Sequence, residues 1–432
     1  MRVEGDGAVY KRCGCRDGHT GRQWGARCPR LGEPAHGRWY FATQITTPDG
    51  KRQRVRRGGF ASRGRAEHAR QQLLALPDAR AAGQVWTVAR WLEYWLDEAT
   101  DRLAPSTLRN YRTHVHRFLI PHLGHIRLGK LHTAQVQGMF RRLATRRAPG
   151  GRLVAAATLQ HIRATLRSAL NEAHRQGLVG HNAARRVRLP HGGRPHAVVW
   201  TPDREALWRA TGLRPAVAVW TPEHLARFLT AVQDDDLFAL WWLVALRGPR
   251  RGETVALRLS DFNFDTSEFT VREQITVVDD LDYLGPPKSP ASYHTVAMDT
   301  VTAEILAAHH ARQLQRLVNG ANPGGYMFTR PDGTPINPDW LTRRFHKLVR
   351  TLGLPPVRLH DLRHGAASIA LAAGADIKTI QQMLGHSSPI TGLETYISVL
   401  PDLAHAAAEA AARLLLAAAG RRRLALLGAS QA

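Results

Sequence analysis

Hydrophobic residues recur at a helical period between residues 85 and about 177, which predicts a helical domain. Each predicted helix carries one apolar stripe, so the helices can pack around a shared core. A Pro-Gly-Gly break near residue 150 separates the last helix from the others. We therefore predict one helical domain over 85–190. The stripes are Val88, Trp91, Leu92 and Trp95; Leu108, Tyr111, Val115 and Phe118; Val136, Met139, Phe140 and Leu143; and Leu159, Ile162, Leu166 and Leu170.

The first 80 residues show the shorter period of β-strands. Asp49-Gly50 separates two runs of strand-forming residues, and Asp-Gly in that place is a hairpin signal. Gly58-Gly59-Phe60 starts a third element, after which helical spacing returns. We expect a three-stranded sheet with one helix over 1–80. The strands and the helix are predicted at 38–41, 51–57, 58–60 and 62–76.

The C-terminal half mixes both periods, which predicts an α+β domain over 216–402. An apolar helix ends at Gly248, and the strands are expected at 268–278 and 292–298. Residues 403–432 are rich in Ala and Leu and predict a helical tail. The fold class is therefore multidomain and mostly α with small β-sheets.

A linker is expected at 191–215, and a short repeat occurs there and just beyond it. Val-Trp-Thr-Pro followed by an acid stands at 199–203 and again at 219–223. Threonine caps a helix, proline suits its first turn, and an acid favours its positive end. The repeat predicts two similar helix openings.

Charge narrows the class of partner. The 432 residues hold 60 Lys and Arg against 35 Asp and Glu, a net charge of +25. Such a surplus favours nucleic acid, although an arginine-rich proteome would give the same balance. The longest apolar run, 237–246, is too short to span a bilayer, and the first residues do not resemble a signal peptide. Three cysteines cannot all pair internally. We expect a cytoplasmic protein with no membrane partner.

The densest set of chemically capable residues lies late in the α+β domain. His360 and Arg363 are three residues apart and share one helix face. Gly385 suits a left-handed helix stop, His386 follows at once, and Tyr396 comes soon after. An arginine fork fits two phosphate oxygens, histidine can move a proton near neutral pH, and tyrosine can be a covalent nucleophile. A lone His-x-x-Arg is more often an ordinary helix face, but the ordered set indicates chemistry on a phosphate.

These motifs resemble those of the tyrosine recombinases of the phage-integrase type. The shared pattern is His-x-x-Arg, Leu-Gly-His and Thr-Tyr, with a Gly-x-Arg-x-Gly-Glu turn at 248–253 and a lysine at Lys288. The resemblance is dense over 220–401 and looser over 85–190. It implies a site-specific DNA recombinase that integrates or excises a phage or other mobile element through a 3′-phosphotyrosyl intermediate. The helical domain would be a SAM-like core-binding domain.

The resemblance also implies a role for each site residue, and no cofactor for catalysis. Arginines would supply the charge that a metal provides elsewhere. The sequence departs from the family at Pro249, where leucine is usual, and at Tyr293-His294, where a basic pair is common. The implied roles are nucleophile for Tyr396, phosphate clamp for Arg250 and Arg363, general acid for Lys288, proton exchange with the tyrosine for His360, phosphate hydrogen bond for His386, and orientation of an arginine for Glu253.

The N-terminal module resembles the arm-type DNA-binding module of many phage integrases. Its basic ribbon could enter the major groove, where arginine can read base edges. A charged edge strand kept soluble would have the same composition. The candidate DNA contacts are Lys51, Arg52, Arg54, Arg56 and Arg57 in the ribbon and Arg109, Arg112, Arg163 and Arg167 in the helical domain.

A zinc site could precede this ribbon. Cys13, Cys15 and Cys28 could supply thiolates, with His36 or His19 as the fourth ligand. Cys-x-Cys with one later cysteine is an incomplete zinc pattern, and plain buried thiols are the alternative.

The expected partners follow from the resemblance. They are double-stranded DNA at attachment sites and a homotetramer on synapsed DNA, which an excisionase or a host DNA-bending factor could assist. A resolvase of chromosome or plasmid dimers is the alternative with the same chemistry, but it usually lacks an N-terminal module. A type IB topoisomerase and a non-catalytic DNA-binding protein are further alternatives, and the complete set of residues argues against the latter.

Overall fold

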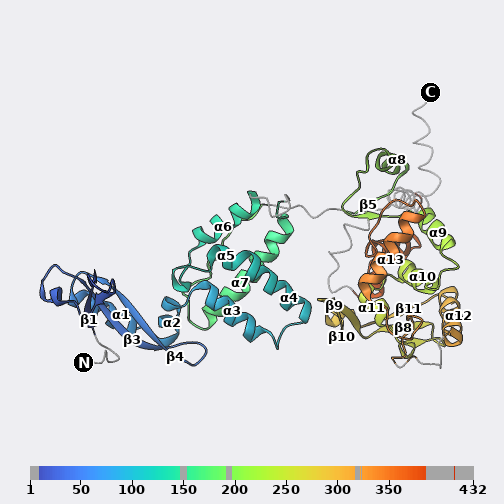
Figure 1. Ribbon diagram of the computed structural model, residues 1–432. Helices are drawn as coiled ribbons and strands as arrows, with labels where there is room; N and C mark the ends of the chain where they lie inside the picture. The colour runs from blue at the N-terminus through green and yellow to red at the C-terminus, as the bar shows by residue number, and fades with distance from the viewer. Residues whose placement is uncertain are drawn as a thin grey trace, which may run out of the picture. The chain divides into compact units, whose positions relative to one another are not determined.

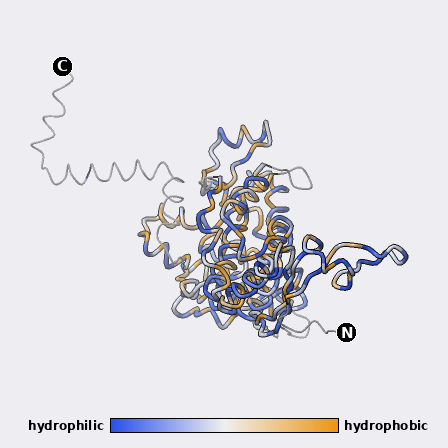
Figure 2. Tube along the Cα trace, turned by 90° about the vertical axis from the view of Figure 1, so that its left-hand side faces the viewer, coloured by the Kyte–Doolittle hydropathy of each residue, from blue (hydrophilic) through white to orange (hydrophobic). Residues whose placement is uncertain are grey.

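The computed structural model describes residues 9–145, 153–190, 197–316, 322, 324–385 and 413, and the structural statements below concern these residues. The chain divides into two compact units, Met1–Gly193 and Arg194–Ala432, and each has its own hydrophobic core. Helices dominate both units and small sheets accompany them, so the expected fold class is confirmed (Figure 1). Hydrophobic and hydrophilic positions interleave along the trace, as amphipathic elements require (Figure 2).

The first unit begins with an antiparallel sheet of four strands in the order β2-β1-β3-β4. The expectation of three strands was wrong, because Gly58-Gly59-Phe60 is the end of one strand and two earlier strands were missed. β1 carries cysteines, a glycine and charges, and β2 is only three residues long, so neither shows an alternating apolar pattern. The elements are β1 (Val9–Arg16), β2 (Gln23–Gly25), β3 (Arg38–Thr46), β4 (Arg52–Phe60) and α1 (Arg63–Leu74).

Two glycines explain why β4 continues past the point where a break was expected. A Cβ on Gly58 would lie 1.7 Å from Cδ1 of Tyr40, so glycine lets that ring cross the strand. Gly59 has φ +91°, and the register between β3 and β4 shifts beside it. A glycine with positive φ at such a shift forms a β-bulge, so the chain stays paired as far as Phe60.

The sheet and the helices that follow share one core. Phe41 and Val55 from the sheet are buried in the same cluster as Trp86 and Trp91. The side-chain oxygen of Gln53 accepts hydrogen bonds from Trp86 Nε1 at 3.2 Å and from an arginine at 2.9 Å. One face of the β3–β4 hairpin therefore packs against the helices.

The helices of this unit follow the predicted periodicity. All four residues are buried in the stripes of α3, α6 and α7, as are Leu108 of α4 and Val115 just beyond it. The chain continues from α4 through a π-helical turn into α5. The elements are α2 (Asp78–Val85), α3 (Val88–Ala99), α4 (Pro105–His114), η2 (Val115–Leu119), α5 (Ile120–Leu123), η3 (Leu128–Lys130), α6 (Thr133–Thr145) and α7 (Ala156–Arg175).

The second unit opens inside the stretch expected to be a linker. β5 (Val198–Val199) pairs in parallel with β6 (Ala218–Val219), and α8 (Pro202–Thr211) lies between them. Trp200 is 1% exposed, and burial of this large ring ties the segment to the core. Most of the expected linker is therefore folded into this unit.

The two predicted helix openings are confirmed. Thr201 caps α8 by accepting from the backbone N of Arg204, and Thr221 caps the next helix by accepting from the backbone N of His224. Both helices carry proline in the first turn. The repeated sequence thus forms the same threonine cap at the start of both helices.

The rest of the second unit packs helices and short strands around one core. Helix α10 packs against α14, and α15 packs against β11. The elements are α9 (Pro222–Ala231), α10 (Phe238–Arg247), α11 (Arg251–Ala256), η4 (Leu259–Asp261), β7 (Phe262–Asn263), β8 (Glu268–Val271), β9 (Gln274–Val278), β10 (Leu281–Gly285), η5 (Pro290–Ser292), β11 (His294–Ala297), α12 (Thr300–Arg316), α13 (Pro338–Thr351), α14 (Asp361–Ala372) and α15 (Ile377–Leu384).

The expected strand 268–278 is two strands. β8 pairs with β11, as predicted for the second expected strand, whereas β9 pairs with β10. The break falls at Arg272 and Glu273, whose side chains turn to ion pairs with Asp261 and Arg258. β10 was missed because most of its residues are exposed and show no buried stripe.

Among the helices that the structure describes, none combines the length and hydrophobicity needed to cross a membrane.

Candidate active site

The turn between α10 and α11 holds the first candidate arginine. Gly248 ends α10 in the left-handed conformation at φ +63°, and Arg250 is the N-cap of α11. Glu253 is fully buried; one carboxylate oxygen accepts from the Arg250 backbone N at 2.7 Å and the other from Arg250 Nη1 at 2.6 Å. The expected orienting role of Glu253 thus has a direct geometric basis. Arg250 stays partly exposed, with 28% of its side chain open.

Arg250 has a different ion-pair partner from those of its two arginine neighbours. Arg247 pairs with Asp299 at 2.6 Å, and Arg251 pairs with Asp339 at 2.6 Å. Only Arg250 of these three turns toward Glu253 in the described region. This orientation supports Arg250 as the candidate, which the sequence had selected only by its spacing from Glu253.

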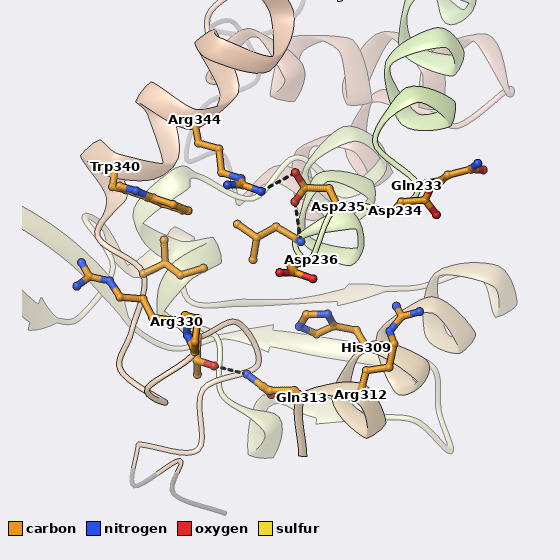
Figure 3. Close-up of a pocket in the computed structure, with 14 residues that line it drawn as sticks. Gln233, Asp234, Asp235, Asp236, His309, Arg312, Gln313, Arg330, Trp340 and Arg344 are labelled. Carbon is orange, nitrogen blue, oxygen red and sulfur yellow. Dashed lines mark hydrogen bonds and ion pairs between the residues drawn. The ribbon is translucent and has the colours of Figure 1, made fainter. Parts of the chain in front are cut away.

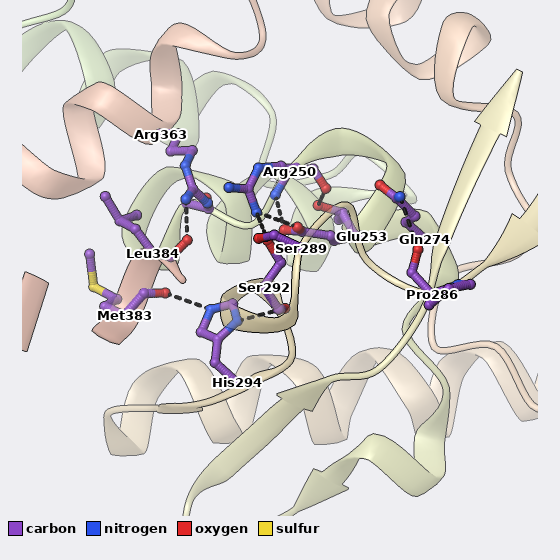
Figure 4. Close-up of polar contacts among 12 residues, drawn as sticks. Arg250, Glu253, Gln274, Pro286, Ser289, Ser292, His294, Arg363, Met383 and Leu384 are labelled. Atoms are coloured by element: carbon purple, nitrogen blue, oxygen red, sulfur yellow. Dashed lines mark hydrogen bonds and ion pairs between the residues drawn. The ribbon is translucent and has the colours of Figure 1, made fainter. Parts of the chain in front are cut away.

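Arg363 lies at the start of α14 and is 2% exposed. Its Nη1 donates to the carbonyl oxygen of Gly248 at 2.7 Å, and its Nη2 donates to the carbonyl oxygen of Leu384 (Figure 4). Helix C-termini present unsatisfied carbonyl groups with partial negative charge, which an arginine can satisfy. Arg363 therefore joins the ends of α10 and α15.

Two serines link the loop that carries Lys288 to Arg250. Ser289 and Ser292 are joined through their hydroxyl oxygens at 3.0 Å. Arg250 Nη1 donates to the Ser292 hydroxyl at 3.1 Å (Figure 4). Lys288 itself is exposed and precedes Ser289 directly. It lies between β10 and η5, in the return segment rather than in the tight turn between β9 and β10.

His360 occupies the N-cap position of α14, three residues before Arg363, and its side chain makes no capping hydrogen bond. Desolvation by surrounding atoms, followed by the charges of His364 and Arg363, lowers the pKa of His360 to about 4. The ring lies edge-on to that of His364, with 5.6 Å between the centroids. His360 is nevertheless exposed to solvent. Its lowered pKa keeps the ring neutral near pH 7.

Two expected residues, His386 and Tyr396, lie outside the described residues, as does the expected tail helix at 403–432 apart from Arg413. The described chain reaches Gly385, which ends α15 at φ +59° as the sequence predicted.

Three polar residues of the site were missed from the sequence. Ser289 and Ser292 link the lysine loop to Arg250, and His294 contacts both the loop and α15. Serines in a loop carry no periodic signal. His294 was noticed only as a departure from a basic pair, and its contacts depend on chain segments far apart in sequence.

The arginines of the β3–β4 hairpin divide between two faces. Arg52, Arg54 and Arg56 are exposed at alternate positions of β4, while Val55 on the other face is buried. Arg57 Nη2 donates to the carbonyl oxygen of Gln84 at 3.2 Å, so its guanidinium contacts the helices. Lys51 is exposed at the turn. We call Arg52, Arg54 and Arg56 the basic ridge.

The candidate contacts in the helical part are also unequal. Arg109, Arg112 and Arg167 are exposed. Arg163 is partly buried and donates from Nη1 to the carbonyl oxygen of Val187 at 2.9 Å. Its guanidinium therefore has a structural contact within this unit.

The sheet brings the three cysteines and His36 together. The ligand atoms of Cys13, Cys15, Cys28 and His36 all lie within 4.8 Å of one another. Nε2 of His36 is 3.5 Å from the Sγ atoms of both Cys15 and Cys28. His19, the other expected ligand, is exposed and outside this group.

The donor set of this cluster suits zinc. A tetrahedral zinc ion with Zn–S bonds of about 2.3 Å holds its ligand atoms roughly 3.5–4 Å apart. Although burial opposes ionisation, the backbone N–H of Cys15 and contacts with Cys28 and His36 lower the pKa of Cys13 to about 7. The cysteines form no disulfide.

A separate cavity of about 740 Å³ lies between α12, α13 and the loop before α10 (Figure 3). Asp235 pairs there with Arg344 at 2.7 Å, and Gln313 donates to the hydroxyl of Thr329 at 2.7 Å. Of the candidate catalytic residues that the structure describes, none lines this cavity. This cavity is therefore lined by residues other than the described residues of the candidate active site.

Comparison with known proteins assigns the family. Residues 220–401 match the model "Phage integrase family", and residues 87–144 match "Phage integrase, N-terminal SAM-like domain". The chain belongs to the phage integrase family, the tyrosine-type site-specific DNA recombinases.

Curated relatives agree with this assignment, and a solved structure shares the fold. The chain is 24% identical to an integrase of Saccharopolyspora erythraea over 374 residues, which covers 76% of this chain and 82% of that protein. It is 27% identical to a XerC-like tyrosine recombinase of Caldanaerobacter subterraneus over 194 residues, 41% of this chain and half of that protein. The fold is similar to that of the Tn1549 transposon integrase in complex with transposon right end DNA, with a TM-score of 0.57 and 17% identity, covering 76% of this chain and 99% of that one.

Proposed function

We propose that this protein is the integrase of a phage or integrative element, and that it cuts and rejoins DNA at attachment sites through a covalent bond between Tyr396 and the DNA 3′ phosphate. The observation that carries the proposal is the convergence of three segments on one place. The Arg250 turn, the Arg363 helix and the Lys288 loop come from distant parts of the sequence and are joined by hydrogen bonds.

The proposed chemistry uses charge and protons of the chain itself. As Tyr396 attacks, negative charge grows on the equatorial phosphate oxygens, and Arg250 would stabilise it from a position fixed beforehand by Glu253. Arg363 would contribute to the same clamp, because a guanidinium has five donors and can bind carbonyl groups and a phosphate together. Lys288 would protonate the leaving 5′ oxygen.

The two histidines complete the proposal. Neutral His360 would accept the tyrosine proton during attack and return it during religation. His386 would hydrogen-bond the phosphate. Because the phosphotyrosyl bond conserves the energy of the broken ester, a 5′ hydroxyl of another strand can reseal the DNA without ATP. Catalysis would need no cofactor.

The test of this proposal is covalent trapping. A duplex from the genomic flank of the coding region, nicked so that the cleaved 5′ end diffuses away, should accumulate protein bound to a DNA 3′ end. Tyr396→Phe keeps the ring but loses the hydroxyl, so it should bind the same DNA and form no adduct. An adduct in that variant would place the nucleophile elsewhere, and no adduct from the wild type on any flanking DNA would reject the recombinase activity.

The basic ridge is proposed to bind a second, arm-type DNA site. Its exposed arginines stand on one face of the hairpin, while the other face packs on the helices. The exposed Arg109, Arg112 and Arg167 would contact phosphates of the core site, whereas Arg57 and Arg163 would act mainly within the fold. The presence of this module favours an integrase over a resolvase.

The proposed assembly is a homotetramer on two synapsed double-stranded DNA sites, with an excisionase or host DNA-bending factor as an accessory partner. Such a protein works in the cytoplasm, where its DNA substrate lies. Counting subunits on synapsed DNA by native mass spectrometry would test the assembly.

We also propose that Cys13, Cys15, Cys28 and His36 bind one structural zinc ion. The cluster joins β1, the segment before η1 and the segment before β3, so the metal would staple an edge of the sheet that has little core of its own. Four protein ligands fill a tetrahedral site, which fits a structural rather than a catalytic ion.

Metal analysis of the full-length protein tests the zinc proposal. We expect about one zinc ion per chain, lost in Cys28→Ser and His36→Asn. His19→Asn is the matched control, because this histidine is exposed and outside the cluster, and it should keep the metal. Purified protein without zinc, prepared without chelators, would reject the site.

A further inference from the structure

His294 opens β11 and bridges two segments of the candidate active site. Its Nδ1 lies 2.9 Å from the carbonyl oxygen of Ser292, and its Nε2 lies 3.1 Å from the carbonyl oxygen of Met383 (Figure 4). Ser292 belongs to the loop that begins at Lys288, and Met383 lies in the last turn of α15. One ring therefore contacts both segments.

The contact completes the C-terminal cap of α15. The last four carbonyl groups of a helix lack partners within it. At the end of α15 the Gly385 N–H donates to the first two of these carbonyl groups, those of Gln381 and Gln382. His294 bonds the carbonyl oxygen of Met383, and Arg363 donates to that of Leu384. Side chains from β11 and α14 thus satisfy the groups that the helix itself cannot.

Gly385 makes room for this ring. A Cβ at Gly385 would lie 2.6 Å from Cε1 of His294 and 2.9 Å from the carbonyl oxygen of Ala291. These distances are shorter than side chains tolerate, so glycine is needed for the close approach as well as for its positive φ. The next residue in the sequence is His386.

The chemistry of the ring matches its surroundings. Carbonyl oxygens only accept hydrogen bonds, so each ring nitrogen must carry a proton to bond its partner. A neutral ring can donate to one of the two carbonyl groups, and the protonated ring can donate to both. An arginine at this position could donate to both at any pH.

We propose that His294 is a positioning residue that holds the end of α15 against the Lys288 loop. It would thereby set where the chain leaves α15 toward His386 and Tyr396, relative to the general acid. The inference rests on the proposed recombinase activity, because only in that reaction must these groups meet at one phosphate.

The experiment compares variants by single-turnover adduct formation on a nicked DNA substrate, with DNA affinity measured separately. Misplacement of reacting groups by about 1 Å can cost about 100-fold in rate. We expect His294→Ala to slow adduct formation roughly 10- to 100-fold with little change in DNA affinity. His294→Arg should recover most of the rate. Tyr293→Ala is the matched control, since this neighbour is 56% exposed, and it should behave like the wild type.

Several results would overturn the inference. They are an unchanged rate in His294→Ala, a loss of DNA affinity as large as the loss of rate, or an arginine variant no better than alanine. If the wild type itself forms no adduct, the proposed function fails. Hydrogen exchange of the free protein then still tests whether His294 holds the end of α15. Faster exchange at residues 381–385 in His294→Ala supports it, and unchanged exchange rejects it.

Discussion

Arg363 Nη1 donates to the carbonyl oxygen of Gly248 across 115 residues of sequence, at 2.7 Å. Gly248 is the left-handed end of α10, and Arg250 follows two residues later. A Cβ at Gly248 would lie 3.2 Å from the Cα of Arg363, so the glycine also permits the close approach of the two helices. One candidate phosphate-binding arginine thus fixes the turn that presents the other.

Removing the Arg363 side chain should therefore affect stability as well as chemistry. Arg363→Ala would leave the carbonyl groups of Gly248 and Leu384 without these donors in a buried place. Each such group costs about 1–3 kcal/mol, so we expect the free energy of unfolding to fall by roughly 2–6 kcal/mol. Urea denaturation followed by tryptophan fluorescence measures this loss.

The control for that prediction is Arg251→Ala in the same turn. The ion pair of Arg251 with Asp339 is exposed, and such pairs contribute about 0–1 kcal/mol. Equal losses of stability in the two variants would contradict the structural role of Arg363.

Lys288 is expected to act as the general acid. A 5′ alkoxide is a poor leaving group and needs a proton, whereas a thiolate does not. General acid catalysis contributes roughly 10²- to 10⁴-fold, so Lys288→Ala should slow cleavage of normal DNA by about that factor. On DNA with sulfur at the bridging 5′ position of the scissile phosphate, the variant should recover substantially. Single-turnover cleavage of both substrates gives the comparison.

Arg250→Ala provides the contrast for the sulfur substrate. Its proposed task concerns the equatorial oxygens, which the sulfur leaves unchanged, so this variant should stay slow on both substrates. A Lys288→Ala protein that is equally impaired on both would transfer the acid role to His360 or His386.

His360 should make the protein less stable as the pH falls below about 6.5. Its pKa is lowered to about 4 in the fold, and the pKa of His364 is lowered as well, mainly by burial. Between the folded and unfolded pKa values the unfolded chain binds more protons, so stability rises with pH across that window and is lost on acidification. His360→Asn should flatten this dependence. Urea midpoints measured from pH 7.5 to 4.5 test it, and identical slopes in both proteins would contradict the shift.

The sequence predicted the amphipathic helices well, for physical reasons. The stripes around Trp91, Phe140 and Leu166 are local patterns that a buried helix face requires, and the structure buries them. The left-handed stop at Gly385 is equally local. β1 and β10 were missed because their residues carry no alternating apolar pattern, and a strand without one is defined by its neighbours.

Contacts between distant segments could not be predicted in the same way. Spacing alone gave Arg250 its pairing with Glu253, but nothing in the sequence showed that Ser292 would join the lysine loop to it. Likewise, the positive charge of the ribbon was evident in the sequence. The hydrogen bond from Arg57 to the carbonyl oxygen of Gln84 depends on how the hairpin packs.

The packing of that hairpin determines how DNA binding by the N-terminal module should be tested. Phe41 and Val55 share a core with Trp86, so deleting residues 1–80 would expose the helices, and surface substitutions are the better probe. Glutamine at Arg52, Arg54 and Arg56 should strongly weaken binding to the arm-type site and leave core-site cleavage intact. Each lost phosphate contact lowers the slope of log affinity against log salt by about 0.9, so the slope should fall by roughly 3.

The matched variant carries glutamine at Arg22, Arg27 and Arg30, which are exposed near the opposite edge of the sheet. It removes the same charge from the same module, so a purely non-specific attraction would weaken equally in both proteins. If the basic ridge itself contacts DNA, the ridge variant should lose the arm-type footprint and the control should keep it. Footprinting at two salt concentrations separates these results, and equal loss in both variants would reject a groove-binding role for the hairpin.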